Sequence, residues 1–211
     1  MGRIIDRRRV MGGKGGLLPS EYQEVEYIET DGNSYINLNE TATIDCEIGL
    51  DCYVVYSQTT TGNQFFMGCR KAGCKAIIGI QPILVYQFGS MSNSIFNKPI
   101  TRNKRHKIVA NNTGCYVDDA LYYPYSGSMS ALESTNHIML FATSTPDDKV
   151  EFHAGQGFRV YSAYVKKNNT YVKNVIPCRR KSDNVIGMYD TVTNTFYTNQ
   201  GRGTFIAGPD V

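Results

Sequence analysis

The chain has 211 residues, of which 41% are hydrophobic and 19% charged, and it contains no tryptophan. A chain of this length can bury roughly 70% of its unfolded surface, so it needs no disulfide bridges to fold. The net charge of +3 is uneven, because residues 1–16 hold five basic side chains and one acidic one, which gives +4 there and −1 elsewhere. A nucleic-acid-binding fold normally carries its basic residues on the folded face. We therefore expect no nucleic acid to bind through the folded domain.

The first segment, residues 1–17, is predicted to be an extended basic arm. Its apolar run stops after Ile4 and Ile5, whereas a secretory signal needs about 7 to 15 apolar residues. No apolar run of about 18 residues occurs anywhere in the sequence, so no membrane span is expected. Glycines between Gly12 and Gly16 give the arm no reason to be ordered by itself. The sequence thus predicts synthesis in a cytoplasm, with an arm followed by one domain over residues 18–211.

From Ser20 onward the sequence predicts short strands almost without interruption. Runs of β-branched and aromatic residues alternate with turn-forming stretches, such as those at 111–114, 166–169 and 191–194. The predicted strands are 22–29, 34–38, 52–57, 63–68, 75–80, 83–88, 106–112, 114–119, 137–143, 149–155, 158–165, 170–177, 184–190, 194–198 and 203–208. Such a series without a long helical pattern is typical of an antiparallel β-sandwich or barrel.

One short stretch, residues 128–134, favours a single helical turn. Ser130 and Glu133 have the spacing of a capping box, in which each side chain bonds to the backbone amide of the other residue. No other part of the chain carries a comparable helical signal.

Six cysteines occur without a CxxC pair or a neighbouring histidine at metal-ligand spacing. Cys46 and Cys52 fall in one predicted strand, about 20 Å apart, and cannot bridge each other there. Cys69 and Cys74 flank a predicted hairpin loop, where a cross-strand disulfide is geometrically possible. Cytoplasmic synthesis favours thiols, so buried small hydrophobic side chains are the preferred interpretation. The other cysteines are Cys115 and Cys178.

Two stretches resemble a known family. They are LPSEYQEVEYIETDGNSYINL at 18–38 and VIPCRRKSDNVIGMYDTVTNTFYTNQGRGTFIAG at 175–208. They resemble the opening and closing segments of concanavalin A-like, laminin-G-like jelly-roll proteins of gut, Bacteroides-associated bacteria and their phages. The opening IIDRRRVMGGK also resembles the leader of members that include virion structural proteins of crAss-like phages. The resemblance implies a concanavalin A-like jelly-roll β-sandwich whose first and last strands lie side by side, and it does not cover 39–174 well.

The resemblance implies a bacteriophage virion structural protein, either a capsid-decorating head fibre or a tail-associated fibre. It implies synthesis in the host bacterial cytoplasm and location in the virion, with other capsid or tail proteins as partners and a homo-oligomer such as a trimer. We expect the arm to attach the domain to the particle, because a short basic segment gains order on an acidic or grooved surface. The candidate attachment residues are Arg7, Arg8, Arg9, Val10, Met11 and Lys14. The alternative is a lectin-like carbohydrate-binding adhesin of a gut bacterium.

A glycoside hydrolase is the least favoured function, and we expect no enzyme and no cofactor. Glu24, Glu26 and Glu29 approach the acidic spacing of retaining glycosidases that share this fold, with Glu in place of the central Asp. That chemistry needs two carboxyl groups about 5.5 Å apart. Strand alternation places Glu29 on the face opposite to Glu24 unless a bulge intervenes. A charged edge strand is therefore the favoured interpretation.

The histidines and paired aspartates predict no metal site. His106, His137 and His153 share no ligand spacing, although a catalytic triad can be assembled from residues far apart in sequence. Calcium needs clustered oxygen ligands. The aspartate pairs at 118–119 and 147–148 do not fit an EF-hand loop, and turn formation is their favoured role.

Aromatic side chains provide the candidate carbohydrate contacts. Tyr122, Tyr123 and Tyr125 surround a proline in a predicted loop, next to Asp118 and Asp119. Exposed aromatic rings beside carboxylates can stack on a sugar face and accept hydrogen bonds from its hydroxyls. The competing interpretation, which we favour, is that the three rings pack onto the sandwich or a subunit interface.

Overall fold

The computed structural model describes residues 18–55, 63–71, 74–80, 83–89, 99–125, 133–145 and 147–211. In these ranges the chain forms strands and no helix, which confirms the all-β prediction. None of the described residues belongs to a helix that is long and apolar enough to cross a membrane. The predicted arm, Ser130 and all six candidate attachment residues lie outside the described residues; the latter are Arg7, Arg8, Arg9, Val10, Met11 and Lys14.

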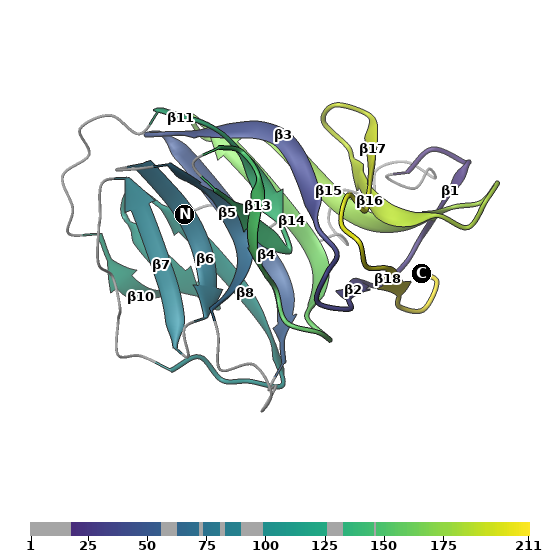
Figure 1. Ribbon diagram of the computed structural model, residues 1–211, viewed down its shortest axis with the longest axis horizontal. Helices are drawn as coiled ribbons and strands as arrows, with labels where there is room; N and C mark the ends of the chain where they lie inside the picture. The colour runs from purple at the N-terminus through teal and green to yellow at the C-terminus, as the bar shows by residue number, and fades with distance from the viewer. Residues whose placement is uncertain are drawn as a thin grey trace.

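Antiparallel pairing arranges the strands in two main sheets (Figure 1). In chain order the strands are β1 (Tyr22–Glu24), β2 (Ile28–Thr30), β3 (Ile36–Thr43), β4 (Cys46–Val54), β5 (Gln64–Lys71), β6 (Cys74–Ile80), β7 (Leu84–Gly89), β8 (Lys104–Asn111), β9 (Gly114–Val117), β10 (Ala120–Pro124), β11 (Glu133–Leu140), β12 (Ala142–Ser144), β13 (Val150–His153), β14 (Arg159–Lys167), β15 (Thr170–Arg180), β16 (Ile186–Asp190), β17 (Thr195–Thr198) and β18 (Phe205–Ala207).

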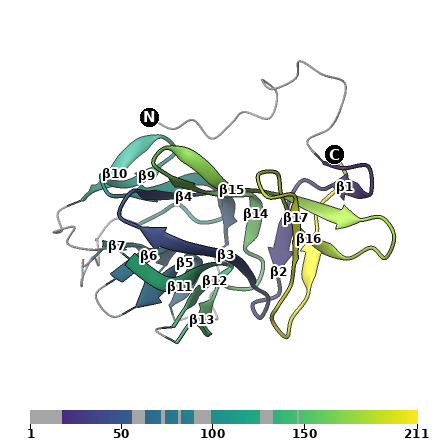
Figure 2. The ribbon, with the colours of Figure 1, turned by 90° about the horizontal axis from the view of Figure 1, so that it is seen from above.

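The large sheet has the order β10-β9-β8-β4-β14-β15-β16-β17, with β1 paired to β15, and β2 paired to both β14 and β18. The second sheet has the order β3-β11-β5-β6-β7, and β12 and β13 form a separate hairpin. Seen from above, the two main sheets form two layers (Figure 2). The described residues are therefore consistent with a β-sandwich.

Strand β4 shows how the sequence produces two different sheet faces. Ile48, Leu50 and Cys52 are fully buried in the main core, whereas Glu47 and Asp51 alternate with them and lie on the outward face. Successive side chains in a strand point to opposite faces, so this alternation commits one face to the core and leaves the other for polar groups. The outward face of the large sheet is where the candidate site lies.

Stacked aromatic rings join the layers of the core. The ring of Phe66 in β5 stacks on that of Phe158, just before β14, with centroids 4.2 Å apart. Phe141 packs edge-on against Phe158, and Phe205 of β18 lies 4.9 Å from Phe141. These rings therefore link the second sheet to the large sheet and to the last strand.

Three assignments made from the sequence, two strands and one loop, are wrong because pairing with distant strands overrides the local pattern. The predicted strand 22–29 divides into β1 and β2, because its first half pairs with β15 and its second half with β14 and β18. The predicted strand 137–143 divides at Phe141, which has a φ of 66°. The segment 120–124, predicted as a loop, is strand β10. The last two residues of the helical turn predicted at 128–134 are strand residues, since β11 begins at Glu133.

The predicted first strand, 22–29, lies beside the last strand through its second half, β2, as the resemblance implies. β2 pairs with β18, and Val25 forms a β-bridge with Asp210. The amide of Val211 donates to the carbonyl of Glu24 at 3.1 Å. Together β1, β2, β16, β17 and β18 form what we call the terminal lobe, at one end of the molecule in Figure 1.

Polar side chains lock the loops of the terminal lobe. One carboxylate oxygen of Asp31 accepts hydrogen bonds from the Asn33 amide and the Ser34 hydroxyl, and the other accepts from the Thr204 amide at 2.8 Å. Burial opposes ionisation of Asp31, but these hydrogen bonds outweigh it and lower its pKa. The side-chain oxygen of Asn199 accepts from the Tyr35 amide at 3.1 Å. The two segments that carry the family resemblance thus hold each other in place.

A buried polar chain fastens β17 to β3. Lys173 Nζ donates to the hydroxyl oxygen of Tyr197 at 2.8 Å, and that hydroxyl donates to the carbonyl of Leu38 at 3.1 Å. Asp190, fully buried, lies 3.6 Å from Lys173 Nζ. Burial alone would lower the pKa of Lys173, but Tyr197 and Asp190 raise it overall. The lysine is therefore held as a charged, structural group.

Five of the cysteines are buried, and they are Cys46, Cys52, Cys69, Cys115 and Cys178. In the β5–β6 hairpin Cys69 lies opposite Ala76, and Cys74 lies opposite Lys71. The two cysteines are therefore not directly opposed across the hairpin.

Candidate functional site

Three hairpin turns on the outward face of the large sheet, those of β8–β9, β9–β10 and β14–β15, border a cavity of about 450 Å³, which we call the hairpin cavity. Its volume falls within the roughly 300–1,000 Å³ of small-molecule sites. Figure 2 shows β9, β10 and the turn between β14 and β15 near one another at the upper edge of the molecule. The hairpin cavity is lined by Glu47, Val109, Asn111, Asn112, Thr113, Tyr116, Asp119 and Asn169.

Two-residue turns present Asp119 and Asn169 at the cavity. Val117 pairs with Ala120, so Asp118 and Asp119 form the turn between β9 and β10, with φ values of 51° and 67°. Asn168 and Asn169 form the equivalent turn between β14 and β15, with φ values of 48° and 60°. Positive φ at both central positions defines the type I′ hairpin turn, which Asn and Asp tolerate well. The predicted turn role of the aspartates at 118–119 is confirmed.

The inner wall of the cavity is a fixed hydrogen-bond network around Glu47. Its Oε1 accepts from the Tyr164 hydroxyl at 2.8 Å and from Lys166 Nζ at 3.0 Å, while its Oε2 accepts from Asn111 Nδ2 at 3.0 Å. Burial opposes ionisation of Glu47, but these hydrogen bonds and the Lys166 charge prevail and lower its pKa. The wall therefore presents an ionised, already compensated carboxylate.

Gly49 makes room for this network. A Cβ atom at this position would lie 2.2 Å from Cε1 of Tyr164, so the ring of Tyr164 covers the glycine directly. The ring can then place its hydroxyl on Glu47. The strand glycine thus marks a close approach of a side chain to the backbone.

The floor and the side of the cavity come from β8, β9 and the turn between them. Val109 and Tyr116 are cross-strand partners and supply apolar surface. The Oδ1 of Asn111 accepts from the Thr113 amide at 2.9 Å and from the Thr113 hydroxyl at 2.7 Å. The Thr113 hydroxyl also lies 3.0 Å from the Tyr116 hydroxyl. The side chain of Asn112 donates to the carbonyl of Ile44 at 3.1 Å, which holds the turn against the start of β4.

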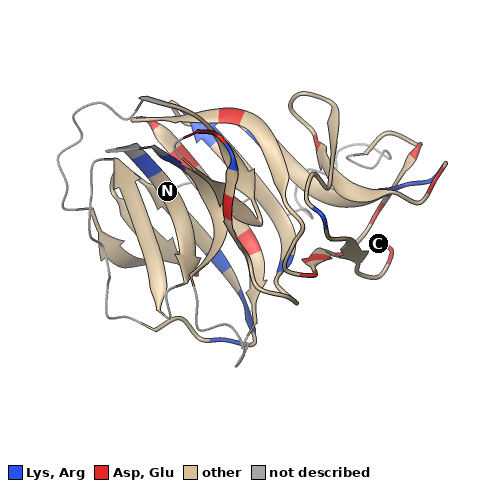
Figure 3. Ribbon diagram, viewed as in Figure 1, with Lys and Arg blue, Asp and Glu red and all other residues tan. Residues whose placement is uncertain are grey.

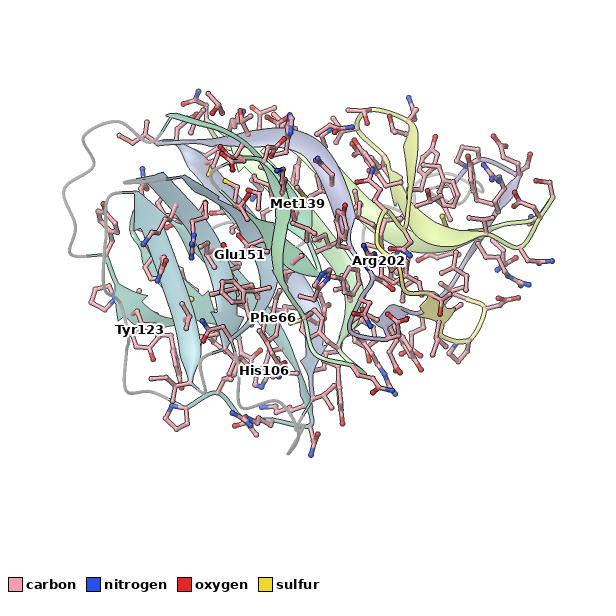
Figure 4. All side chains as sticks on the ribbon, viewed as in Figure 1. Phe66, His106, Tyr123, Met139, Glu151 and Arg202 are labelled. Atoms are coloured by element: carbon pink, nitrogen blue, oxygen red, sulfur yellow. The ribbon has the colours of Figure 1, made fainter. Side chains whose placement is uncertain are left out.

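A second, more open cavity of about 410 Å³ lies on the same face and shares Asp119 with the first. Its walls are charged: Arg105 Nε and Nη2 donate to Asp51 at 2.6 and 2.8 Å, and the guanidinium stacks 3.7 Å from the centroid of the Tyr161 ring. The hydrogen bond to Asp51 raises the pKa of Arg105. His106, labelled in Figure 4, is buried, with Nδ1 2.9 Å from Asp118. Arg105 and Asp51 are thus paired with each other.

Charges of both signs alternate over the described strands in the view of Figure 3. This distribution agrees with the near-neutral charge calculated for the domain. Within the described ranges no three histidine, cysteine or acidic side chains gather as a metal site would require.

The three tyrosines pack against the core. Tyr123, labelled in Figure 4, is only 3% exposed and belongs to the main core. Tyr122 and Tyr125 are partly buried against the same core, and the Tyr122 hydroxyl donates to the carbonyl of Pro99. This geometry favours packing over sugar stacking for these rings. Of the five candidate glycan contacts, the structure brings Asp118 to the charged cavity and Asp119 to both cavities.

The three glutamates of the predicted acidic stretch do not share a strand. Glu24 lies in β1 opposite Cys178, Glu26 is exposed between strands, and Glu29 lies in β2. The carboxylate of Glu29 accepts from Arg159 Nε at 2.6 Å. The prediction of a charged edge strand is wrong for β2, which pairs on both sides with β14 and β18.

The other paired aspartates hold a loop. Asp148 accepts from the backbone amide of His137 at 2.7 Å and lies 2.6 Å from its Nδ1, which ties the segment before β13 to β11. Asp147 is exposed. The turn role predicted for this pair agrees with the positive φ of Asp148.

Comparisons of the chain with protein-family models, curated proteins and solved structures found no match. The functional argument therefore rests on the chain's own sequence and geometry. Sequence reasoning missed most of the hairpin cavity, above all Glu47, Tyr116 and Asn169. The local signals were the asparagine-rich turns and Gly49, which lies between Cys46 and Cys52.

Proposed function

We propose that the chain is a bacteriophage virion structural protein, a head fibre or tail-associated fibre that displays a jelly-roll module. In this proposal residues 1–17 attach the domain to other capsid or tail proteins, and the module is a homo-oligomer such as a trimer. The observation that carries it is the interlocking of the two segments that resemble the family. Asp31 and Thr204, one from each segment, are hydrogen-bond partners within the terminal lobe. The residues behind the resemblance thus build one shared scaffold, and this supports the proposal because the resemblance implies that the opening and closing segments lie together.

Deletion of residues 1–16 from the phage gene tests the proposal. We expect the truncated protein to stay folded and soluble but to be missing from purified particles, as measured by mass spectrometry. A variant with Arg7, Arg8 and Arg9 changed to Gln should also lose incorporation, whereas the matched change to Lys keeps the charge and should retain most of it. Incorporation of the truncated protein at the full-length level would contradict attachment by the arm.

The hairpin cavity favours a second candidate function, carbohydrate binding by a lectin-like adhesin. Amide, hydroxyl and carboxylate groups converge there around a small apolar floor, as they do in sites that orient polar ligands. A glycan array probed with the full chain tests this candidate. Binding is expected for a subset of glycans, and an array without signal argues against it. A displayed fibre can also adhere, so the two functions are compatible.

A further inference from the structure

We infer that the hairpin cavity binds one residue of a neutral, hydroxyl-rich sugar, with Tyr116, Asp119 and Asn169 as its direct contacts. The inference deepens the carbohydrate-binding candidate and depends on it, and it does not depend on attachment to a virion. Nothing in the sequence had indicated Tyr116 or Asn169 as contacts.

The cavity offers hydrogen-bonding groups that the protein itself leaves unused. Among the described residues, no hydrogen bond or ion pair engages the carboxylate of Asp119 or the side-chain amide of Asn169. Both residues are exposed, and they come from two different hairpins. A ligand that fills the cavity can therefore reach both groups without breaking contacts within the protein.

The backbone that carries these two groups is already fixed. Each residue lies at the second central position of a type I′ turn, whose backbone is held by positive φ values and by the flanking strand pairs. Binding therefore orders the two side chains but little backbone, which limits the conformational entropy that a ligand must offset.

The floor suits the flat, C–H-rich face of a pyranose. Val109 and the ring of Tyr116 lie side by side on β8 and β9, and both are partly exposed. The Tyr116 hydroxyl is held beside Thr113, so the ring has one defined position. An aromatic ring with a polar end can offer apolar contact and a hydrogen bond to the same ligand.

The charges of the lining select against anionic ligands. Glu47 and Asp119 line the cavity, and no lysine or arginine of the described residues does so. Glu47 is already compensated by Lys166, which leaves the Asp119 carboxylate as the acceptor for a donor-rich ligand. A carboxylated or sulfated sugar would bring like charge to Asp119, whereas neutral hydroxyls donate to it. Because amide and hydroxyl groups dominate the lining, a neutral sugar fits better than an ammonium group.

Protein-observed NMR with the full chain tests the site directly. The probes are methyl glycosides of neutral hexoses and N-acetylhexosamines, with glucosamine and methyl glucuronide as the cationic and anionic counterparts. We expect at least one neutral probe to shift the backbone amide signals of 109–119 and 168–170 in a saturable way. The neutral probe should bind more tightly than either charged one.

Variants locate the contacts. Asp119→Asn keeps a residue that tolerates the turn but removes the charge, and should weaken the binding of the neutral probe by about tenfold or more. Tyr116→Ala should abolish the shifts, and Asp147→Asn, a change at an exposed aspartate outside the cavity, should leave them unchanged. A thermal melt of each variant confirms that it is folded.

Four results would overturn the inference. They are saturable shifts confined to other surfaces, an unchanged affinity in folded Asp119→Asn and Tyr116→Ala, tighter binding of the charged probes, and a panel without any binding. If the array shows glycan binding while the cavity signals stay still, the carbohydrate-binding function survives and the site assignment fails.

Discussion

The carboxylate of Asp31 accepts a hydrogen bond of 2.8 Å from the backbone amide of Thr204, 173 residues further along the chain. Asp31→Asn should break this link selectively. The side-chain oxygen of the asparagine can still accept from Asn33 and Ser34, but its NH2 group faces the Thr204 amide, and two donors cannot bond to each other. We expect the free energy of unfolding to fall by about 0.5–1.5 kcal/mol, the usual net contribution of one hydrogen bond, because Asp31 is only partly buried and Thr204 is exposed. Urea denaturation measures the change, with Asp147→Asn as an exposed control that should stay within about 0.5 kcal/mol.

Gly203→Ala probes the same contact from the other segment. A Cβ atom there would lie 2.1 Å from Oδ1 of Asp31, so the carboxylate must move. The variant should be destabilised on its own. Since both changes act on one contact, combining it with Asp31→Asn should cost less than the sum of the two. Full additivity would mean that the contact does not couple the two segments.

Local sequence pattern was sufficient to predict most strands but not where they divide. Strand β6, predicted at 75–80, is observed at Cys74–Ile80, because its short run of apolar residues with Ile77, Ile78 and Ile80 is visible in the sequence itself. The break between β1 and β2 is a different case. Residues 22–24 and 28–30 are both good strand formers. The strand divides between them because the first part pairs with β15 and the second part pairs with β14. No local pattern carries that information.

The candidate site shows the same limit. The turn at Asp118–Asp119 was predictable from residue type, since these residues favour tight turns. The hairpin cavity depends on the β14–β15 turn lying beside the β8–β9 turn, which follows from the order of strands in the sheet. The three tyrosines were predicted in a loop, whereas pairing with β9 makes the segment a strand and turns Tyr123 into the core.

Gly49→Ala should disturb the wall of the hairpin cavity. The new methyl group would overlap the ring of Tyr164, and moving that ring removes its hydroxyl from Glu47. We expect a loss of about 1–3 kcal/mol in the free energy of unfolding, as for other overpacked positions. A double-mutant cycle with Tyr164→Ala measures the clash. The alanine at 49 should be much less harmful once the ring is gone, and an equal penalty in both backgrounds would contradict the proposed overlap.

Glu47 should make the stability depend on pH in the acidic range. Its pKa is lowered in the folded state, because hydrogen bonds and Lys166 outweigh the opposing effect of burial. The folded protein therefore binds fewer protons than the unfolded chain, and the contribution of Glu47 is complete above the ordinary glutamate pKa of about 4.3. It is lost as the pH falls through the lowered value.

Denaturation from pH 7 down to about pH 3 checks this dependence. Glu47→Gln should have a smaller slope of unfolding free energy against pH than the wild type. Glu26→Gln, at an exposed glutamate, serves as the control and should keep the wild-type slope. An identical slope for Glu47→Gln and the wild type would contradict the prediction.

The core cysteines should resist alkylation in the folded protein. Burial raises the pKa of Cys46, Cys115 and Cys178 to about 12 and raises that of Cys52 as well. The thiolate is the reactive form, so iodoacetamide at about pH 8 should leave these four residues unmodified until the protein unfolds. Peptide mass spectrometry after labelling with and without guanidinium measures this. Labelling of any of the four at the unfolded rate would show that its site opens in the native state.

The pairing of β2 with β18 also determines when the domain can be completed during synthesis. The ribosome makes the chain from its N-terminus, so β2 and Asp31 emerge long before β18 and Thr204 exist. Contacts at such large sequence separation form late, because the long intervening chain must first be ordered. Until the last strand is released, one edge of β2 is open to other chains. The terminal lobe is therefore the part of this protein that most needs protection as it is made.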